Sequence, residues 1–198
     1  RGSQQEAGHM GTLLQLRSAA WCARREDAIR SSTGEAILVT NVRLDSSHHS
    51  GANIVVDPSS RFVYHDCGDC TEGGVWQHRI GADGTLTPLD PLVVGQPGFI
   101  AVHPSGEFAY VTNSSSNTVW HYGVGVDGQL SLLAPATVVT GTGPRSIAVD
   151  PSGQFAYVAN GSSNDVSQYR IAADGQLNAL APTTVAAGES PRSIALSQ

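Results

Sequence analysis

The chain has 198 residues, of which 40% are hydrophobic and 14% charged, with 22 Gly and 10 Pro. This mixture is typical of many short strands joined by turns rather than of long helices. The net charge of −6 excludes a strongly basic nucleic-acid surface. No apolar run approaches the roughly 18 residues that a membrane span needs, so we expect neither nucleic acid nor membrane as a partner.

The first part of the chain has no repeat character. Residues 1–10 (RGSQQEAGHM) have the composition of an expression tag and are left out of functional argument. Residues 11–34 place Leu and Ala among arginines, which predicts either an amphipathic helix or a disordered leader. No secretory signal is evident, which favours the bacterial cytoplasm and leaves export open.

The rest of the chain is a tandem repeat. FIAVHPSGEFAYVTN from Phe99 and SIAVDPSGQFAYVAN from Ser146 are identical at 11 of 15 positions. A weaker copy, NIVVDPSSRFVYHDC, begins 46 residues earlier at Asn53, and a further copy starts at Ser193. A period of 46–47 residues is typical of the blades of a β-propeller.

Each period predicts four short strands. An apolar strand (SIAV) precedes a PSG turn, and a second strand (QFAYVAN) leads into a polar loop. A third strand (VSQYRI) ends at an Asp-Gly turn, which suits a tight hairpin, and a fourth (ATVVTG or TTVAAG) completes the period. Four antiparallel strands per period make one blade, so the fold class is all-β and the expected blades span about 51–97, 98–144 and 145–191.

The segments FAYVTN and FAYVAN, with PSG before them and PRSIAV closing the period, resemble the YVTN repeat. They are also similar to the seven-bladed lactonase-like family, which includes 6-phosphogluconolactonase-like proteins. The resemblance covers about residues 51–198. It implies a propeller, and it leaves function open because propellers of this kind include enzymes, binding modules and surface proteins.

Three complete blades leave a ring unclosed. Residues 35–41 (EAILVTN) match the second strand of a blade, and residues 192–198 begin a new innermost strand. We therefore expect residues 35–198 to form a partial propeller in which these two segments make a composite blade. Closure within one chain would give four blades, whereas closure between two chains would give six to eight. We favour a homodimer with exchanged strands.

The first copy departs from its siblings at the loop after its second strand. His65-Asp66-Cys67 stands where the second copy has Val111-Thr112-Asn113, and Cys70 follows in a loop two residues longer. The preceding inter-blade loop carries His48 and His49. In a propeller both loop types lie on one face, so these side chains are expected close together.

Imidazole, thiolate and carboxylate suit zinc or a similar divalent ion, and a metal-bound water can act as a nucleophile near neutral pH. The predicted ligands are His48, His49, His65, Asp66, Cys67 and Cys70. The same residues could instead be a disulfide or two free thiols beside a solvated polar loop. His78, His103, Trp76 and Trp120 are interpreted as packing residues.

Arg145 and Arg192 enter innermost strands and are the predicted catalytic residues, since they could bind an anionic substrate or steady a developing negative charge. The alternative is a hydrogen bond or an ion pair between blades. The favoured function is a metal-dependent hydrolase of lactone, ester or phosphoester substrates of the phosphotriester type, which uses a metal-bound hydroxide at the loop face of the propeller. The alternative function is a non-catalytic interaction module or a self-assembling partial propeller. A third interpretation is a designed or recombinant fragment. The divergent first copy argues against a consensus design.

Overall fold

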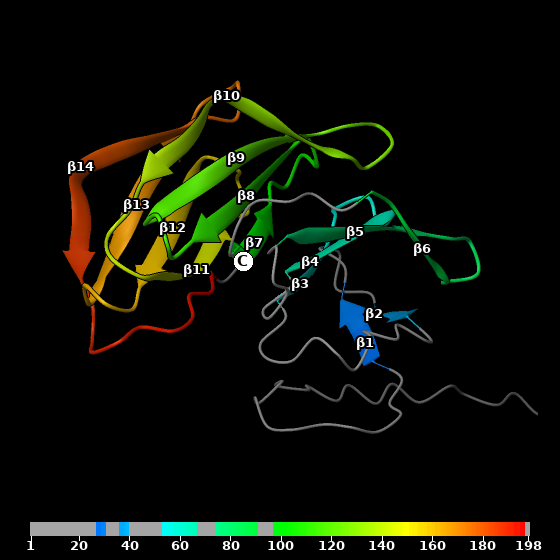
Figure 1. The fold of residues 1–198 in the computed structure, drawn as a ribbon, viewed down its shortest axis with the longest axis horizontal. Coiled ribbons are helices and arrows are strands. Elements are labelled where there is room, and N and C mark those ends of the chain that lie inside the picture. Colours follow the sequence, from blue (N-terminus) through cyan, green and yellow to red (C-terminus); the bar gives the residue numbers. More distant parts are fainter. Residues whose placement is uncertain (1–26, 31–35, 40–52, 67–73, 91–96, 197–198) are drawn as a thin grey trace, which may run out of the picture.

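The structure, a computed structural model, describes residues 27–30, 36–39, 53–66, 74–90 and 97–196. Within these ranges every regular element is a β-strand. The strands form three four-stranded antiparallel sheets and one two-stranded sheet, and each sheet follows chain order from one edge to the other (Figure 1). The expected all-β partial propeller is confirmed.

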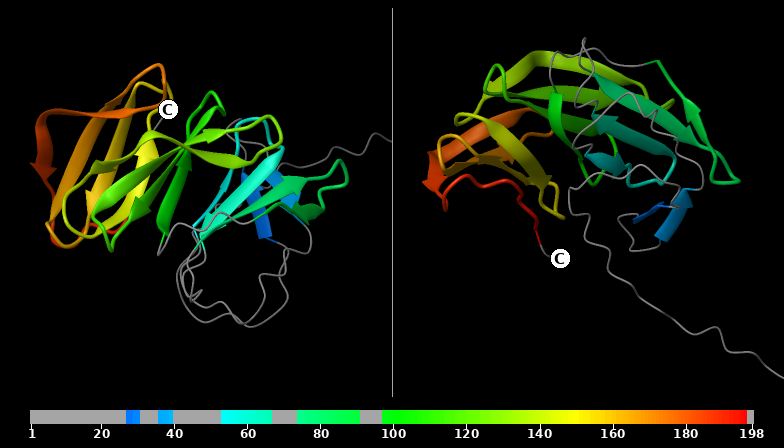
Figure 2. Two further views of the ribbon diagram at one scale, coloured as in Figure 1. Left: turned by 45° about the horizontal axis from the view of Figure 1, so that its top comes forward. Right: turned by 60° about the horizontal axis from the view of Figure 1, so that its bottom comes forward.

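Each four-stranded sheet is one blade. Blade 1 contains β3 (Ile54–Val56), β4 (Phe62–Asp66), β5 (Val75–Ile80) and β6 (Leu86–Pro88). Blade 2 contains β7 (Pro97–Val102), β8 (Phe108–Asn113), β9 (Thr118–Val124) and β10 (Leu130–Val139). Blade 3 contains β11 (Pro144–Val149), β12 (Phe155–Asn160), β13 (Asp165–Ile171) and β14 (Leu177–Ala186). The blades follow one another in a fan with their first strands innermost (Figure 2).

The Asp-Gly turns join the third and fourth strands as the sequence predicted. Their glycines adopt φ values of 78° at Gly84, 86° at Gly128 and 82° at Gly175, which residues other than glycine rarely adopt. In each turn the aspartate Oδ1 accepts the N–H two residues on, at 3.1 Å from Thr85, Gln129 and Gln176. The same local chemistry therefore builds the same hairpin three times.

The fourth strands of blades 2 and 3 are longer than the sequence indicated. β10 starts at Leu130, directly after the turn, and not near Ala136. Its pairing with β9 is interrupted between Leu132 and Thr137. Pro135 lies in this interruption and has no N–H to donate. The strand thus pairs in two parts, of which the sequence pattern revealed only the second.

The core lies between blades. One cluster joins Phe62, Tyr64 and Val75 of blade 1 to residues of blade 2 that include Val111 and Tyr122. An equivalent cluster joins blade 2 to blade 3. Because neighbouring strand residues point to opposite faces, every blade has a forward face toward the next blade and a rear face toward the previous one. Phe62, Tyr64 and Val75 lie on the forward face of blade 1.

The segment before blade 1 contains a short hairpin. β1 (Asp27–Arg30) pairs antiparallel with β2 (Ala36–Val39). Residues 27–30 are thus a strand within the segment expected to be helical or disordered, and the other residues of 11–34 lie outside the described ranges. Within one chain β2 pairs with β1, while residues 192–196 belong to no strand of the described structure. The composite blade with 35–41 stays a prediction.

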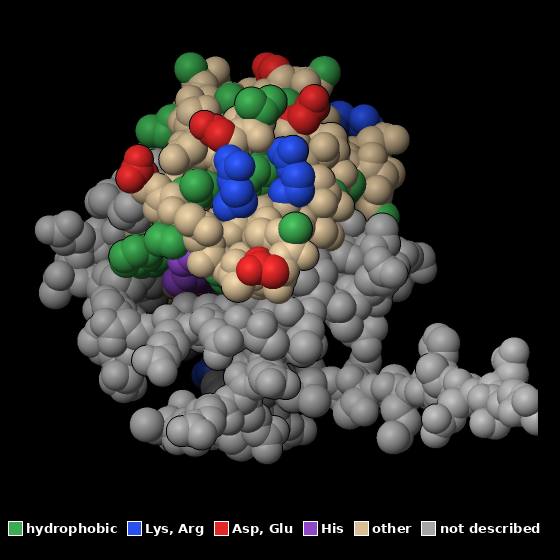
Figure 3. All heavy atoms as spheres, turned by 90° about the vertical axis from the view of Figure 1, so that its right-hand side faces the viewer, with side chains coloured by type: hydrophobic (Ala, Val, Ile, Leu, Met, Phe, Trp, Pro, Cys, Tyr) green, Lys and Arg blue, Asp and Glu red, His purple; other side chains and the backbone are tan. Residues whose placement is uncertain are grey.

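No helix in the described part of the chain has the length and apolar character needed to cross a membrane. Seen from the side of β6, the described surface mixes acidic, basic and apolar side chains (Figure 3). That face therefore carries no single-sign charged patch of the kind that attracts a polyanion.

Candidate functional site at the loop end of the inner strands

Two kinds of loop meet at one end of the blades, as the propeller interpretation required. Asn117 and Asn164 lie in the loops between second and third strands and have φ values of 55° and 59°. Their Oδ1 atoms accept backbone N–H groups of the inter-blade segments, from Gly143 at 2.8 Å and from Ser190 at 2.7 Å. These bonds fix the inter-blade loops just before Arg145 and Arg192.

Arg145 follows the first residue of β11, at a break in its pairing with β12 between Pro144 and Ser146. Its side chain runs across Gly161, where an added Cβ would lie 2.3 Å from the Arg145 Nε. Gly161 therefore provides the space in which this arginine lies. The guanidinium remains exposed to solvent.

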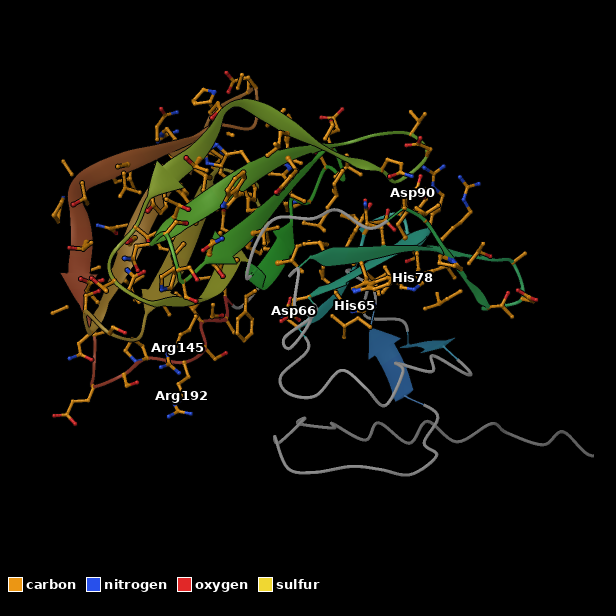
Figure 4. The ribbon with its side chains drawn as sticks, in the orientation of Figure 1. His65, Asp66, His78, Asp90, Arg145 and Arg192 are labelled. Carbon is orange, nitrogen blue, oxygen red and sulfur yellow. The ribbon has the colours of Figure 1, made fainter. Side chains whose placement is uncertain are left out.

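Arg192 occupies the corresponding position one blade further on. Ile194 donates its N–H to the Ser146 Oγ at 3.3 Å, just as Ile100 donates to the Asn53 Oδ1 at 3.1 Å. Residues 192–196 thus lie where the next innermost strand of a propeller would run. Arg145 and Arg192 project at the same end of the molecule (Figure 4).

Neither arginine is neutralised within the described residues, where no ion pair involves Arg145 or Arg192. The same position in blade 2 is Gly98, whose added Cβ would lie 2.6 Å from the Thr112 Oγ1. An arginine there would need Thr112 to move, so the two cations occur only in β11 and in the segment after β14. The structure places the two predicted catalytic residues at one end, as exposed positive charges on neighbouring chain segments.

Asp66 lies at the same end of blade 1, where β4 finishes. Its Oδ1 accepts the N–H of Asn53, the role that the Thr112 Oγ1 plays for the N–H of Phe99 at 2.8 Å. Burial raises the pKa of the Asp66 carboxyl to about 7. The group is therefore able to exchange a proton near neutral pH. The sequence did not indicate this backbone contact, which becomes visible only by aligning Asp66 with Thr112.

His65 points away from Asp66, onto the rear face of blade 1. Its ring stacks on His78 with centroids 5.3 Å apart and on Trp76 at 6.5 Å. Burial lowers the pKa of both histidines, and the Nδ1 of His78 is buried without a hydrogen-bond partner among the described residues. The packing interpretation of His78 and Trp76 thus agrees with the geometry.

Among the described residues, no group of three or more His, Cys, Asp and Glu side chains is arranged to hold a metal ion. Of the six predicted ligands, His48, His49, Cys67 and Cys70 lie outside the described ranges. The remaining two, His65 and Asp66, project from opposite faces of β4. They do not converge on a common point, so metal binding stays a prediction that depends on the other four.

His103 bridges two blades. Its Nδ1 lies 2.8 Å from the Ser105 Oγ and its Nε2 lies 2.9 Å from the carbonyl oxygen of Gly153 in the next blade. Trp120 packs at the edge of the cluster between blades 1 and 2. Both residues therefore have the packing roles expected from the sequence.

The fold and the repeated contacts between blades define a β-propeller. A family model described as the seven-bladed β-propeller lactonase matches residues 83–195, which is more than half of the chain. The chain belongs to this lactonase propeller family.

Solved structures with the same fold have low sequence identity. A putative 6-phosphogluconolactonase from Bacteroides fragilis is 22% identical with a TM-score of 0.65, over 73% of this chain and 41% of its own. The periplasmic gluconolactonase of Pseudomonas aeruginosa is 24% identical with a TM-score of 0.62, over 72% and 41%. A protein from Lactobacillus plantarum is 19% identical with a TM-score of 0.68, over 84% and 50%.

These likenesses establish the fold alone. This chain spans half or less of the length of these three structures. No protein of curated function matches the sequence.

Proposed function

We propose that this chain is a hydrolytic propeller module that opens a lactone bearing an anionic group, such as the carboxylate or phosphate of a sugar-acid derivative. The observation that carries the proposal is the pair of exposed arginines, Arg145 and Arg192, at the loop end of the inner strands. Membership of the lactonase family supports the reaction class. The names of the gluconolactonase-like structures support the substrate class.

The chemistry suits two guanidinium groups. A water oxygen bonds to the lactone carbonyl carbon as a base takes the water's proton, and the carbonyl oxygen becomes an oxyanion. The ring C–O bond then breaks as the ring oxygen takes up that proton, which leaves a hydroxy acid. A fixed cation stabilises the oxyanion more than the neutral carbonyl, and so lowers the barrier. One arginine can serve this role while the other holds the anionic substituent in a forked contact.

Water needs a group that takes its proton. Asp66 is the described carboxyl at this end with a pKa of about 7, raised by burial. A base with such a pKa is well matched to neutral pH. We assign this role to Asp66 within the proposal, and we assign no step to a metal because His65 and Asp66 do not face one another.

The arginine prediction is tested with Arg145→Gln and Arg192→Gln. Each removes a charge and keeps a polar side chain, and loss of one oxyanion or anion contact is expected to lower kcat/KM by roughly 10²-fold. The matched control is Arg79→Gln, which removes an arginine that lies over the Phe62 ring, 5.7 Å from its centroid. Steady-state hydrolysis of neutral and anionic lactones is the measurement. An equal effect of all three substitutions would contradict the assignment.

The base is tested separately with Asp66→Thr. Threonine can accept the Asn53 N–H as Thr112 accepts that of Phe99, so this change removes the carboxyl and retains the backbone contact. We expect kcat to fall by roughly 10²-fold with KM little changed. Retention of wild-type kcat would remove Asp66 from the mechanism.

Metal dependence is a separate proposal that rests on His48, His49, Cys67 and Cys70. Elemental analysis of protein purified without chelator, followed by titration with zinc, measures it directly. About one ion per chain would support metal-assisted hydrolysis. If no metal binds and no lactone, ester or phosphoester is turned over, the non-catalytic interaction module becomes the better interpretation.

A further inference from the structure

Blade 3 differs from blade 2 at three positions around the arginine of β11. The blade 3 residues, each followed by its blade 2 counterpart, are Arg145 and Gly98, Gly161 and Ser114, and Asp165 and Thr118. The exposed cation therefore occurs together with a glycine in the loop between β12 and β13 and with a carboxylate at the start of β13. Both of these residues make contacts that reach the arginine or the segment leading into it.

Glycine at position 161 is required by the Arg145 side chain and not by its own backbone. The φ of Gly161 lies outside the positive range in which glycine is favoured, so the backbone there could carry a side chain. An added Cβ, however, would lie 2.3 Å from the Arg145 Nε and 2.5 Å from its Cδ. The serine that blade 2 has at this position would therefore displace the arginine.

Asp165 anchors the loop between β12 and β13. Its Oδ1 accepts the hydroxyl of Ser163 at 3.0 Å and the Nδ2–H of Asn160 at 2.6 Å. Asn160 is completely buried, and its Nδ2 also donates to the Ser167 Oγ at 2.8 Å. Because Asn160 and Asp165 are cross-strand partners where β12 ends and β13 begins, the carboxylate closes the loop at its base.

The same network holds the inter-blade segment that leads into β11. Gly141 donates its N–H to the Ser167 Oγ at 3.0 Å, and Thr142 donates its N–H to the Ser163 Oγ at 2.9 Å. An added Cβ at Gly141 would lie 2.5 Å from the Asp165 Oδ1, so the carboxylate packs directly against this segment. The backbone before the arginine is thus fixed by side chains that share one acceptor, the Asp165 carboxylate.

Blade 2 arranges the equivalent loop differently. The Asn113 Oδ1 accepts the N–H groups of Ser115 and Ser116, each at 3.0 Å, within its own loop. In blade 3 the two corresponding N–H groups donate instead to the Thr142 carbonyl oxygen, at 3.1 and 3.2 Å. Because Asn160 is bound to the carboxylate, the blade 3 loop is tied to the inter-blade segment and not to its own asparagine.

We propose that Asp165 is a positioning residue that, together with Gly161, holds the Arg145 guanidinium in the orientation that the reaction uses. The inference rests on the proposed lactone hydrolysis for its functional meaning. A cation that is already oriented stabilises an anion or an oxyanion better than one that has to be ordered first. Asp165 acts through Arg145, by way of the loop and the inter-blade segment on either side of it.

The position of Arg145 can be followed without any substrate. With isotope-labelled protein, its Nε–H signal is identified by NMR as the signal that the Arg145→Gln variant lacks. Asp165→Thr, which introduces the blade 2 residue, should shift this signal by more than its linewidth and leave the signals of Arg79 and Arg170 unchanged. An Arg145 signal that stays in place in Asp165→Thr overturns the proposal.

Asp165→Asn separates the loss of the acceptor from the loss of the charge. The asparagine Oδ1 can accept the same two bonds, from Ser163 and Asn160, although the side chain is neutral. We therefore expect the Arg145 signal of Asp165→Asn to stay close to that of the wild type. An equal shift in Asp165→Asn and Asp165→Thr would mean that charge alone moves the signal, and would contradict a positioning role.

Hydrolysis of an anionic lactone connects the positioning to the reaction. Asp165→Thr should lower kcat/KM by roughly tenfold, less than Arg145→Gln does. In the Arg145→Gln background it should have no further effect, because the residue through which it acts is gone. A general structural role would instead give independent losses that multiply. The control is Asp174→Thr, which changes an aspartate at the opposite end of β13 and should leave kcat/KM unchanged.

The two measurements distinguish a failure of this inference from a failure of the proposed function. If the wild type hydrolyses no lactone, the proposed function is wrong, whereas the NMR signal still tests whether Asp165 positions Arg145. Circular dichroism identifies a variant that has unfolded. Should Asp165→Thr unfold, Ser163→Ala replaces it, since it removes a single member of the network and should shift the Arg145 signal in the same way. An unshifted signal in folded Ser163→Ala would then overturn the proposal.

Discussion

At the scale of single residues, two separate structural constraints require glycine at position 128. Its φ of 86° lies in the left-handed region, and the Phe62 ring of the preceding blade occupies the place of a Cβ. The Asp-Gly pair in the sequence predicted the first constraint, the positive φ. The second constraint, the contact with Phe62, depends on a residue 66 positions earlier and is evident only from the packing of the two blades.

We expect Gly128→Ala to lower the free energy of unfolding by about 2 kcal/mol or more, since the backbone strain adds to the displacement of the Phe62 ring. Gly188→Ala is the matched control, because an added Cβ there meets nothing within 4 Å. Urea denaturation of both variants measures the difference. Equal stability of the two would show that the Phe62 contact is not maintained in solution.

At the scale of elements, one position of the third strand links each blade to the next. Gln77 accepts the Leu130 N–H at 2.8 Å, and His121 uses its Nδ1 to contact the Gln176 Oε1 at 2.8 Å. The Nε2 of His121 is buried without a partner among the described residues. Burial lowers the pKa of this imidazole, so the neutral ring with the proton on Nδ1 is the form that fits.

Acid should weaken the interface between blades 2 and 3. An unfolded histidine has a pKa near 6.5, so below about that pH the unfolded chain takes up a proton that folded His121 resists. Stability is therefore highest above pH 6.5 and falls as the pH drops below it. The substitution His121→Gln introduces the residue that blade 1 has at the equivalent position, Gln77. It should reduce the dependence of stability on pH. The difference between the two stability curves from pH 5 to pH 8 isolates His121 from other titrating groups, and parallel curves would refute the prediction.

At the scale of the whole molecule, stability comes from contacts between neighbouring blades, as in other repeat proteins. Blade 2 is covered on both faces by described blades, whereas no described blade covers the forward face of blade 3. Tyr110 and Tyr122 of blade 2 are both fully buried, while Tyr157 is not. The three sheets should therefore differ in their local free energies of opening.

Hydrogen exchange under dilute, monomeric conditions should show the slowest amides in β8 and β9, with faster exchange in β13 and β14. Local opening of a terminal blade breaks one interface, whereas opening of blade 2 breaks two. Mass spectrometry of peptides from each strand provides the measurement. Protection that is uniform across the blades would indicate a single cooperative unit and contradict this picture.

Local signals in the sequence predicted the blades well. The structure contains three repeated sheets. They follow the spacing of FAYVTN and FAYVAN and have the predicted Asp-Gly and PSG turns. The first part of β10 was not predicted. Its pairing with β9 is interrupted around Pro135, so the sequence pattern indicated only the second part of the strand. The strand at 27–30 was missed for a similar reason, since four residues are too few to show a period.

The candidate site was predictable in part. Arg145 and Arg192 were recognisable from their place at the start of inner strands, and the structure leaves both exposed at one end. The direction of His65 and the contact of Asp66 with Asn53 were not recognisable, because each depends on which face of β4 a side chain occupies and on what lies across from it.

The sequence by itself determined the repeat, the blade and the turns, because these depend on residues within one period of 46–47 positions. Only the tertiary structure decided which side chains of one blade meet the next, as when the Phe62 ring packs on Gly128 and the Phe108 ring packs on Gly175. Such contacts join positions more than a full period apart, so no pattern within one period records them.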